Sequence, residues 1–383
     1  MIFDINTTSV CNLGCLYCSE GKNPNMPDKS RILNSKTKVT IQDLDLLVNQ
    51  VFEKDPKDDI VFAFWGGEPF LNFDFCKEVM YHFKDNNKIS FLFYSNGFYI
   101  EKYLEDIKEL NRVLGKKPSD GRSRLFIQIS YDGRKINDIE RLTKNGKSTS
   151  DVTLKAFNLL RENGIETKTK STVTPKTFKY LFDAFKEHVE MKTNYFPTPD
   201  AFSDTDYDNE EYLKDLKINL MQIAKYIYDN KLEPETFRWF SKSKALCQAG
   251  IGYFSFDLDG EATPCHSTMY ESFSDHHVGN IRDVDLFEKF SKATEKYKDL
   301  SSKIQENCKD CDCLFCIRCP AGNYNLPSNL EIMKTEKVDN EYIFRWTHKN
   351  NNMCKVFKIA DTIHKTLRQL IQDRKDRTNA GNI

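Results

Sequence analysis

Three cysteines near the amino terminus have the type and spacing to bind an iron–sulfur cluster. Residues 10–18 read Val-Cys-Asn-Leu-Gly-Cys-Leu-Tyr-Cys, which places Cys11, Cys15 and Cys18 in a C-x3-C-x2-C array. Cysteine thiolates are the usual ligands of such clusters. A cubane contains four irons, so three cysteines leave one iron without a protein ligand. Such an iron suits chemistry better than electron storage, because a substrate or cofactor can bind it.

The alternative for these cysteines is a zinc site with a fourth, distant ligand. Zinc sites usually pair their cysteines as C-x2-C, whereas this array also contains a C-x3-C spacing. The spacing therefore favours an iron–sulfur cluster over zinc.

A second motif follows an apolar run. Residues 60–64 have the pattern of a buried parallel strand, and Gly66-Gly67-Glu68-Pro69 comes directly after Trp65. Two glycines allow the backbone to come close to a ligand, and a carboxylate follows at once. The motif therefore predicts a ligand-binding turn at the end of a strand.

Strand and helix patterns alternate through the first half of the chain. Predicted strands cover residues 2–7, 60–64, 89–94, 125–131 and 165–173. Predicted helices lie at about 40–52, 73–84, 100–110, 154–160 and 175–189, with Thr40 as the N-cap of the first. This alternation predicts parallel strands joined by crossover helices. Ligands of such folds bind at the carboxyl ends of the strands, where both motifs fall.

The cysteine array, with Tyr17 before its last cysteine and Gly-Gly-Glu-Pro about 50 residues later, resembles the signature of the radical S-adenosylmethionine (radical SAM) superfamily. The resemblance implies an α/β fold, a partial (β/α)6 TIM-like barrel over residues 1–200. It also implies a catalytic [4Fe-4S] cluster whose open iron is chelated by S-adenosylmethionine. Reduction then gives a 5′-deoxyadenosyl radical that abstracts hydrogen from the substrate.

The resemblance also implies further cofactor contacts. In the family, the backbone and glutamate of Gly66-Gly67-Glu68-Pro69 meet the methionine amino group. Ser130 ends a predicted strand where the family has a polar contact to the cofactor, and Arg141 matches an arginine that meets the methionine carboxylate. The alternative for Arg141 is a solvated helix charge. Asn96 is a further cofactor-site candidate, although Ser-Asn-Gly is also an ordinary turn.

The second half of the chain is rich in cysteine and carries a predicted hairpin. Asp259-Gly260 is a turn signal between two short strand patterns, and this hairpin would bring Cys265 back towards Cys247. A zinc ribbon is the alternative for the cysteines of residues 308–319 taken alone. Eight cysteines would fully supply two four-iron clusters: Cys247, Cys265, Cys308, Cys311, Cys313, Cys316, Cys319 and Cys354.

This half resembles the SPASM extension of radical SAM enzymes, through Gly260-x4-Cys265 and the late final cysteine. The resemblance implies two auxiliary [4Fe-4S] clusters. Cys247, Cys265 and Cys319 would share one cluster, and Cys308, Cys311, Cys316 and Cys354 the other. Cys313 is either the eighth ligand or not a ligand. The family spacing is C-x2-C-x5-C-x3-C, whereas residues 308–319 give x2, x4 and x2, so the partition between the clusters stays open.

Composition limits the class of protein. The chain has 383 residues with 56 basic and 57 acidic side chains, which gives no reason to expect nucleic acid or a membrane as a partner. It has no apolar stretch long enough to span a bilayer and no secretory signal, and its twelve cysteines fit metal ligation in a reducing cytoplasm. The predicted parts are a barrel (1–200), a linker with an amphipathic helix over 213–227 (201–240), the SPASM domain (241–355), and a final helix and tail (356–383).

Relatives with this extension mostly modify peptides or proteins, by crosslinking or by side-chain oxidation. The resemblance therefore implies a peptide or protein substrate and an electron donor such as flavodoxin or ferredoxin. The alternatives are a small-molecule dehydrogenase or mutase, and a non-catalytic iron–sulfur or zinc module. Sulfatase-maturating relatives would carry an aspartate base after the second cysteine of this half, where this chain has His266, which can also accept a proton. We expect no leader-binding domain before the first strand; the oligomeric state is not predicted.

Overall fold

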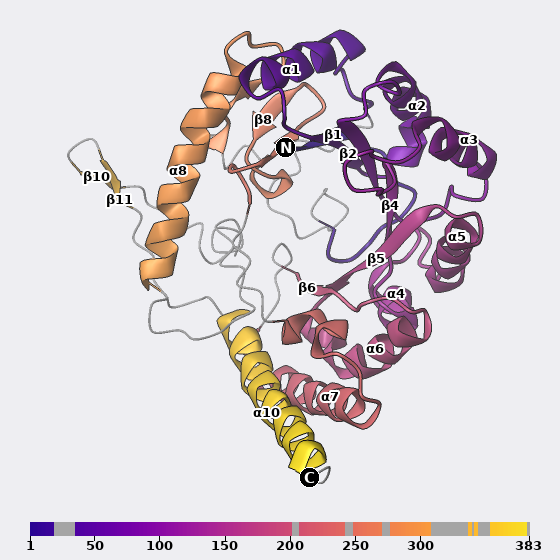
Figure 1. Cartoon of the computed structure of the whole chain (residues 1–383), viewed down its shortest axis with the longest axis vertical. Helices are drawn as coiled ribbons and strands as arrows, with labels where there is room; N and C mark the ends of the chain where they lie inside the picture. The colour runs from indigo at the N-terminus through magenta and orange to yellow at the C-terminus, as the bar shows by residue number, and fades with distance from the viewer. Residues whose placement is uncertain are drawn as a thin grey trace. The chain divides into compact units, whose positions relative to one another are not determined.

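Strands and helices alternate through the first half of the chain, as predicted (Figure 1). The computed structural model describes residues 1–18, 35–200, 207–241, 248–269, 276–307, 336–338, 341–343 and 353–380. The strands of the first half are β1 (Ile2–Thr8), β2 (Ile60–Gly66), β3 (Ile89–Ser95), β4 (Leu125–Ser130), β5 (Glu166–Val173) and β6 (Pro197–Pro199). Its helices are α1 (Ile41–Lys54), α2 (Phe73–His82), α3 (Leu104–Leu114), α4 (Arg134–Glu140), α5 (Ser150–Glu162) and α6 (Leu181–Glu190), with short 3-10 turns at Pro69–Asn72 and Pro175–Tyr180.

The second half contains longer helices and short strands. They are α7 (Glu210–Asp229), β7 (Tyr253–Phe256), β8 (Glu261–Thr263), β9 (Gly279–Asn280), α8 (Leu286–Asn307), β10 (Glu336–Val338), β11 (Glu341–Ile343) and α10 (Met353–Ala380). Among the described residues, no helix has an apolar stretch that would let it cross a membrane.

Contacts between residues divide the chain into two units. The first contains residues 1–131, 141–169 and 248–303. The second contains residues 132–140, 170–247 and 304–383. The domain boundaries expected from the sequence, at residues 200, 240 and 355, stay predictions.

A sheet with the strand order β4-β3-β2-β1-β7-β8-β9 forms the centre of the first unit. Its strands are parallel from β4 to β7, and β8 and β9 add antiparallel strands at the edge. The predicted hairpin at Asp259-Gly260 is the turn between β7 and β8, with Ser255 opposite Thr263. The region that begins the cysteine-rich half therefore extends the same sheet as β1.

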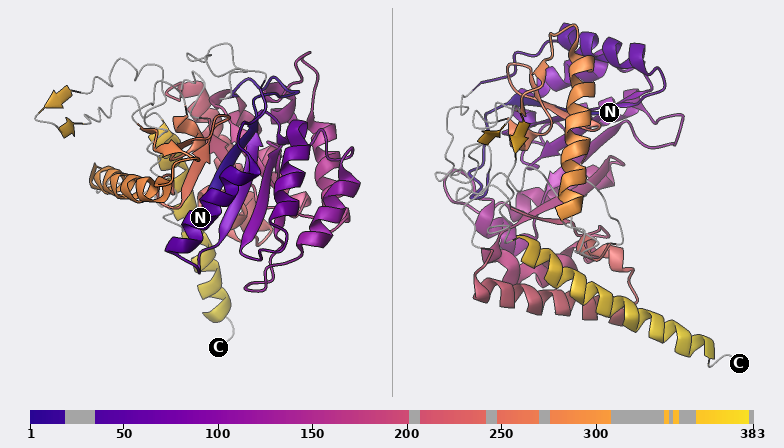
Figure 2. Two further views of the ribbon diagram at one scale, coloured as in Figure 1. Left: turned by 90° about the horizontal axis from the view of Figure 1, so that it is seen from above. Right: turned by 90° about the vertical axis from the view of Figure 1, so that its left-hand side faces the viewer.

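The two faces of this sheet differ in chemistry, because successive side chains of a strand point to opposite faces. One face is aromatic and contacts the 3-10 turn at Pro69–Asn72 and the start of α2: the ring centroids of Phe70 and Phe73 lie 4.9 and 6.1 Å from that of Phe93. Each fully buried phenylalanine stabilises the fold by about 1.5 to 3 kcal/mol. The helices α1, α2 and α3 run along the strands on this side (Figure 2). The opposite face, here named the polar face, carries Asp4, Asn6, Trp65, Tyr94 and Gln128.

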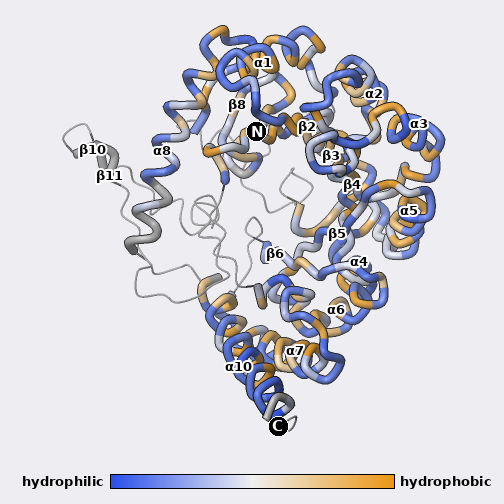
Figure 3. Tube along the Cα trace, in the orientation of Figure 1, coloured by the Kyte–Doolittle hydropathy of each residue, from blue (hydrophilic) through white to orange (hydrophobic). Residues whose placement is uncertain are grey.

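The second unit contains a helical core. The apolar side of α7 packs against α10, and the alternating colours along both helices in Figure 3 show their amphipathic character. Residues of α7 in this core are Leu216, Leu220, Ile223 and Ile227, and those of α10 are Val356, Phe357, Ala360 and Leu367. The helix predicted from residue 356 in fact begins at Met353, so Cys354 lies in its first turn.

Two other expectations were wrong in detail. The proline, aspartate and threonine content of residues 194–209 indicates an irregular connection, but Pro197–Pro199 pairs with β5 as the parallel strand β6. The two prolines of this segment hide its strand character from local propensity, although an edge strand tolerates them. The helix predicted from Ile100 begins at Leu104, after a series of turns.

Candidate functional site

The three amino-terminal cysteines lie in the loop that follows β1, at the carboxyl end of that strand. Cys11 is buried, with 9% of its surface exposed, whereas Cys15 and Cys18 are half-buried. Partial burial suits cluster ligands, because it limits the access of water to the sulfur atoms.

Backbone hydrogen bonds hold this cysteine loop (residues 9–18) from two sides. Ser9 N donates to Ser35 O at 3.0 Å, and Gly14 N donates to Leu142 O at 2.8 Å. The first bond fixes the start of the loop, and the second fixes its middle. The positions of the cysteines are therefore set by segments that are distant in sequence.

Arg141 lies against the cysteine loop. Its guanidinium carbon is 5.2 Å from the centroid of the Tyr17 ring, a cation–π arrangement. The carbonyl of Arg141 accepts a hydrogen bond from Thr149 Oγ1 at 2.6 Å. The structure thus brings Arg141 to the loop that carries the cysteines, while its predicted contact to a carboxylate stays a prediction.

Gly67 allows β2 and the cysteine loop to approach closely. Gly67 N donates to Thr8 O at 2.7 Å, and Glu68 N donates to Val10 O at 2.9 Å. A Cβ atom at Gly67 would lie 2.2 Å from Val10 O and 2.8 Å from Ser9 O. These contacts are with backbone atoms, which cannot rotate away as a flexible side chain can. A glycine is therefore required at position 67.

We predict that Gly67→Ala displaces the cysteine loop and lowers the iron bound per chain after anaerobic reconstitution. The matched control is Gly14→Ala in the loop itself, because a Cβ there would meet its nearest atoms at 3.8 and 4.0 Å, ordinary contact distances. Iron and sulfide analysis measures both variants. Equal iron contents in the two variants would contradict the prediction.

The Glu68 carboxylate is buried and turned towards the end of β3. Its Oε1 accepts hydrogen bonds from Ser95 Oγ at 2.9 Å and Phe70 N at 3.3 Å, and its Oε2 accepts one from Asn96 N at 2.8 Å. Burial raises the pKa of Glu68 to about 7, although these hydrogen bonds oppose the shift. Glu68 therefore ties the glycine-rich turn to the turn that follows β3.

This pKa has a consequence for stability. The pKa of Glu68 is 4.5 in the unfolded chain and about 7 in the native state. At a pH between these two values, the carboxyl is therefore protonated in the native state and ionised in the unfolded chain. Its contribution to the free energy of unfolding therefore decreases as the pH rises between these two values and is constant above them. We compare the free energy of unfolding of the wild type with that of Glu68→Gln, which cannot ionise at this position. We predict that the difference, wild type minus variant, becomes smaller as the pH rises from about 5.5 to 7. Urea unfolding at several pH values measures this difference, and a difference that grows with pH would mean that the hydrogen bonds outweigh burial.

Asn96 and Ser130, two other predicted cofactor-site residues, lie at the carboxyl ends of neighbouring strands. Ser130 is the last residue of β4 and is half-buried. Asn96 follows β3, is 7% exposed and points its amide at the cysteine loop, where Nδ2 donates to Asn12 Oδ1 at 2.9 Å. The structure therefore brings Asn96 to the cysteines.

A network on the polar face was not predicted. Asp4 is 1% exposed, and its carboxylate accepts hydrogen bonds from the hydroxyls of Tyr253 and Ser255. The hydroxyl of Tyr253 lies 3.3 Å from Nδ1 of His266, and the Trp65 and His266 ring centroids are 5.3 Å apart. Burial raises the pKa of Asp4, and the neighbouring His266 partly offsets this.

Sequence reasoning selected His266 only from its place after Cys265. A signal for Asp4 was present, because a charged residue alternates with Phe3 and Ile5 in an otherwise buried strand. No local signal connects residue 4 with residue 253.

Two of the eight cysteines of the second half lie in the described part of the chain. Cys265 follows β8 and is half-buried, and Cys354 lies in the first turn of α10. Cys247 and residues 308–319 lie outside the described residues, and so do the predicted ligands Cys308, Cys311, Cys313, Cys316 and Cys319. The predicted partition of these ligands between two clusters stays a prediction.

The surroundings of the cysteine loop fit an iron–sulfur cluster. Two N–H groups point at Cys11 Sγ: the backbone N–H of Leu13, at 3.4 Å, and Nδ2 of Asn96, at 3.9 Å. Such donors suit a thiolate that binds iron.

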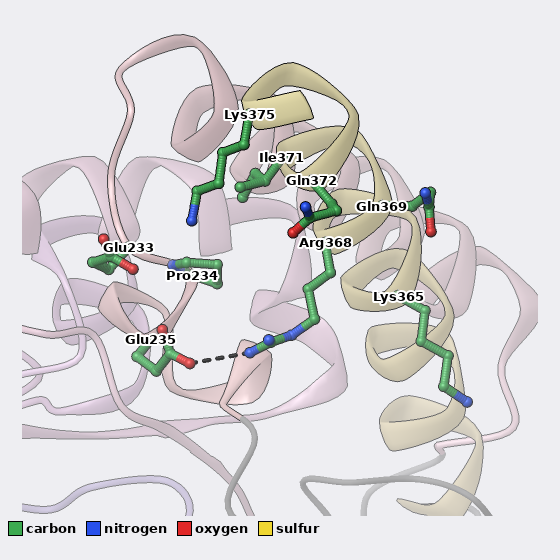
Figure 4. A pocket seen from close by; sticks show the side chains of 9 residues that line it. All are labelled: Glu233, Pro234, Glu235, Lys365, Arg368, Gln369, Ile371, Gln372 and Lys375. Carbon is green, nitrogen blue, oxygen red and sulfur yellow. Dashed lines mark hydrogen bonds and ion pairs between the residues drawn. The ribbon is translucent and has the colours of Figure 1, made fainter. Parts of the chain in front are cut away.

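A hollow of about 550 Å³ lies in the second unit, between α10 and the turn at residues 233–235 (Figure 4). Arg368 and Glu235 form an ion pair at 3.1 Å in its wall. Its lining mixes acidic and basic side chains and contains none of the predicted site residues.

Comparison with known families agrees with this geometry. Residues 5–190 match the family model of the radical SAM superfamily, and residues 247–313 match that of SPASM, an iron–sulfur cluster-binding domain. The site and the fold therefore define a radical SAM enzyme. The chain belongs to the radical SAM superfamily and carries a SPASM domain, with a partial TIM-like barrel and a SPASM extension as its fold. Membership implies a [4Fe-4S] cluster with S-adenosylmethionine, and iron–sulfur clusters in the SPASM domain.

Two curated proteins are similar to part of the chain. An uncharacterized protein of Methanocaldococcus jannaschii is 32% identical over 187 residues, which are 48% of this chain and 56% of that protein. The radical SAM cyclopropyl synthase TigE of Paramaledivibacter caminithermalis is 24% identical over 196 residues, 48% of this chain and 37% of that protein. The match thus spans little more than half of the first relative and about a third of the second.

Solved structures of anSMEcpe share the fold along nearly the whole chain. The structure with bound AdoMet gives a TM-score of 0.68 at 20% identity and covers 97% of this chain and 99% of that one. The structure with AdoMet and the Cp18Cys peptide gives a TM-score of 0.65 at 20% identity, with the same coverage. At this identity the likeness shows the fold alone.

Proposed function

We propose that this enzyme modifies a peptide or protein after abstracting hydrogen from one of its side chains or from its backbone. The observation that carries the proposal is that the cysteine loop, the glycine-rich turn and Asn96 contact one another at the carboxyl ends of the parallel strands β1, β2 and β3, the strands that also contribute to the polar face. The peptide bound in the anSMEcpe structure, which has the same fold, supports a peptide as substrate. The products we propose are a thioether or other crosslink, or an oxidised side chain.

The cofactors would be held by residues that the family motifs identify. Cys11, Cys15 and Cys18 would bind the catalytic cluster. The glycine-rich turn (residues 66–69), Asn96, Ser130 and Arg141 would bind or surround S-adenosylmethionine. When both are bound and an electron is supplied, the chemistry they contribute is formation of a 5′-deoxyadenosyl radical. Two auxiliary [4Fe-4S] clusters on the later cysteines, and a flavodoxin or ferredoxin as the cytoplasmic electron donor, complete the proposal.

His266 is the candidate to accept a proton from the substrate. Its side chain is 41% exposed, so it is accessible from solvent, while Asp4 behind it is buried. If the Tyr253 hydroxyl donates to Asp4, its oxygen can accept a hydrogen bond from Nδ1 of His266. That arrangement leaves Nε2 as the basic nitrogen of the neutral ring. A basic nitrogen at this position fits removal of a proton during oxidation of a peptide.

The experiment uses anaerobically reconstituted full-length protein with S-adenosylmethionine and dithionite. We expect formation of 5′-deoxyadenosine. We also expect mass spectrometry to show the loss of hydrogen atoms from a peptide that is encoded beside the gene and supplied to the enzyme. Conversion of a small molecule, with no change in any such peptide, would instead support a dehydrogenase or mutase. Absence of 5′-deoxyadenosine under all these conditions would contradict the proposal.

A further inference from the structure

The side chain of Asn96 is fixed by its surroundings. Its backbone N–H donates to Glu68 Oε2 at 2.8 Å, and its carbonyl accepts from Thr153 Oγ1 at 3.1 Å. Its own Oδ1 accepts from Phe98 N at 3.0 Å. The amide oxygen is thus used within the turn, and the Nδ2 hydrogens must point the other way. Because the residue is 7% exposed, water does not compete strongly for them.

The Nδ2 atom of Asn96 faces the first cysteine of the array. It donates to Asn12 Oδ1 at 2.9 Å and lies 3.9 Å from Cys11 Sγ, a long N–H···S hydrogen bond. The backbone N–H of Leu13 also donates to Cys11 Sγ, at 3.4 Å. Oδ1 of Asn12 lies 3.9 Å from the same sulfur. Two N–H groups and one oxygen therefore surround Cys11 Sγ within 4 Å.

The charge of the sulfur gives these contacts a consequence. A cysteine that binds iron does so as a thiolate. Adding one electron to a cluster increases the negative charge on its sulfur ligands, and N–H donors stabilise that charge. An amide oxygen at a similar distance has the opposite effect. Loss of the Asn96 amide should therefore make the cluster harder to reduce.

We propose that Asn96 is a positioning residue that donates a hydrogen bond to the Cys11 thiolate and raises the reduction potential of the catalytic cluster. Glu68 acts through it, because the Glu68 carboxylate holds the backbone of Asn96. The glycine-rich turn and the cluster ligand thus share one hydrogen-bond network. The inference rests on the cluster of the proposed function but not on the identity of the substrate.

The test is a potentiometric titration of the anaerobically reconstituted full-length enzyme, in which electron paramagnetic resonance measures the reduced cluster at each potential. The signal of the catalytic cluster is the one that changes when S-adenosylmethionine is added. We expect a more negative midpoint potential in Asn96→Leu, which lacks the donor. We expect a larger shift in Asn96→Asp, which keeps the shape but places a carboxylate beside the thiolate.

A second variant gives a shift of opposite sign. Asn12→Ala removes the competing acceptor of Asn96 Nδ2 and the oxygen near the sulfur, so the potential should become less negative. The matched control is Asn72→Ala. Asn72 is 6% exposed and donates through Nδ2 to Thr7 O at 2.9 Å, so the control also removes a buried amide near the glycine-rich turn. Its potential should equal that of the wild type.

Either of two results would overturn the inference. The first is an unchanged potential in the Asn96 variants that retain iron. The second is a shift in Asn72→Ala as large as theirs, because it would mean a general structural effect. If the Asn96 variants retain no cluster, the potential of Asn12→Ala alone tests the inference. A potential of Asn12→Ala that is unchanged or more negative than that of the wild type rejects it. The measurement uses no peptide, so its failure is distinct from a failure of the proposed substrate class.

Discussion

Replacing Cys11, Cys15 and Cys18 together by alanine is expected to remove about four irons per chain and all reductive cleavage of S-adenosylmethionine. The reason is that these three thiols are the protein ligands we assign to the catalytic cluster, and the loop that carries them is fixed by backbone bonds on two sides. Iron and sulfide analysis, with chromatography of 5′-deoxyadenosine after dithionite reduction, measures both effects. With two auxiliary clusters, the wild type should hold about twelve irons and the variant about eight.

Cys76→Ala is the matched control for this variant. Cys76 is fully buried in α2, and burial raises the pKa of its thiol well above the ordinary value, so it is a poor metal ligand. The control should keep its iron and its activity. A triple variant that keeps the iron content of the wild type would show that the cluster is bound elsewhere.

The positions of the motifs in the fold were predictable from the sequence, because local rules determine them. Thr40 and Asp43 form the capping box that starts α1, as the sequence indicates. The alternation of strand patterns, among them the apolar run at residues 60–64, with amphipathic helical segments identifies a parallel sheet. The cysteine loop, the glycine-rich turn and Asn96 therefore had to follow β1, β2 and β3, and they do.

The contacts of the site were not predictable, because they join residues far apart in sequence. The Glu68 oxygens are occupied by Ser95, Asn96 and Phe70, and no pattern in residues 66–69 indicates which way the carboxylate turns. The Asp4–Tyr253 hydrogen bond depends on β7 pairing in parallel with β1 across some 250 residues of chain. A pairing at that separation leaves no periodicity in either strand.

Arg124 also makes contacts that join residues far apart in sequence. Its replacement is expected to have the largest effect on stability. It is 1% exposed, and its guanidinium donates to backbone carbonyls of the turn between α2 and β3, of the start of β3 and of the end of α3. The acceptors are Ile89 O at 2.8 Å, Lys84 O at 2.5 Å, Leu114 O at 3.1 Å, Phe83 O at 3.0 Å and Asn86 O at 2.8 Å. Carbonyls at helix ends carry partial negative charge and have no partner within the helix.

Arg124→Met should therefore lower the free energy of unfolding by at least about 3 kcal/mol, because five backbone carbonyls each lose a hydrogen bond from one buried guanidinium. Lysine should not rescue it, since one ammonium cannot reach five acceptors arranged around a planar fork. The matched control is Arg122→Met, two residues away. Arg122 is exposed and pairs with Asp120, and an exposed ion pair contributes little to stability because water competes for both charges. Urea unfolding of the three variants beside the wild type measures these changes. If Arg124→Met were as stable as Arg122→Met, the carbonyls at the ends of α2 and α3 would not depend on this guanidinium.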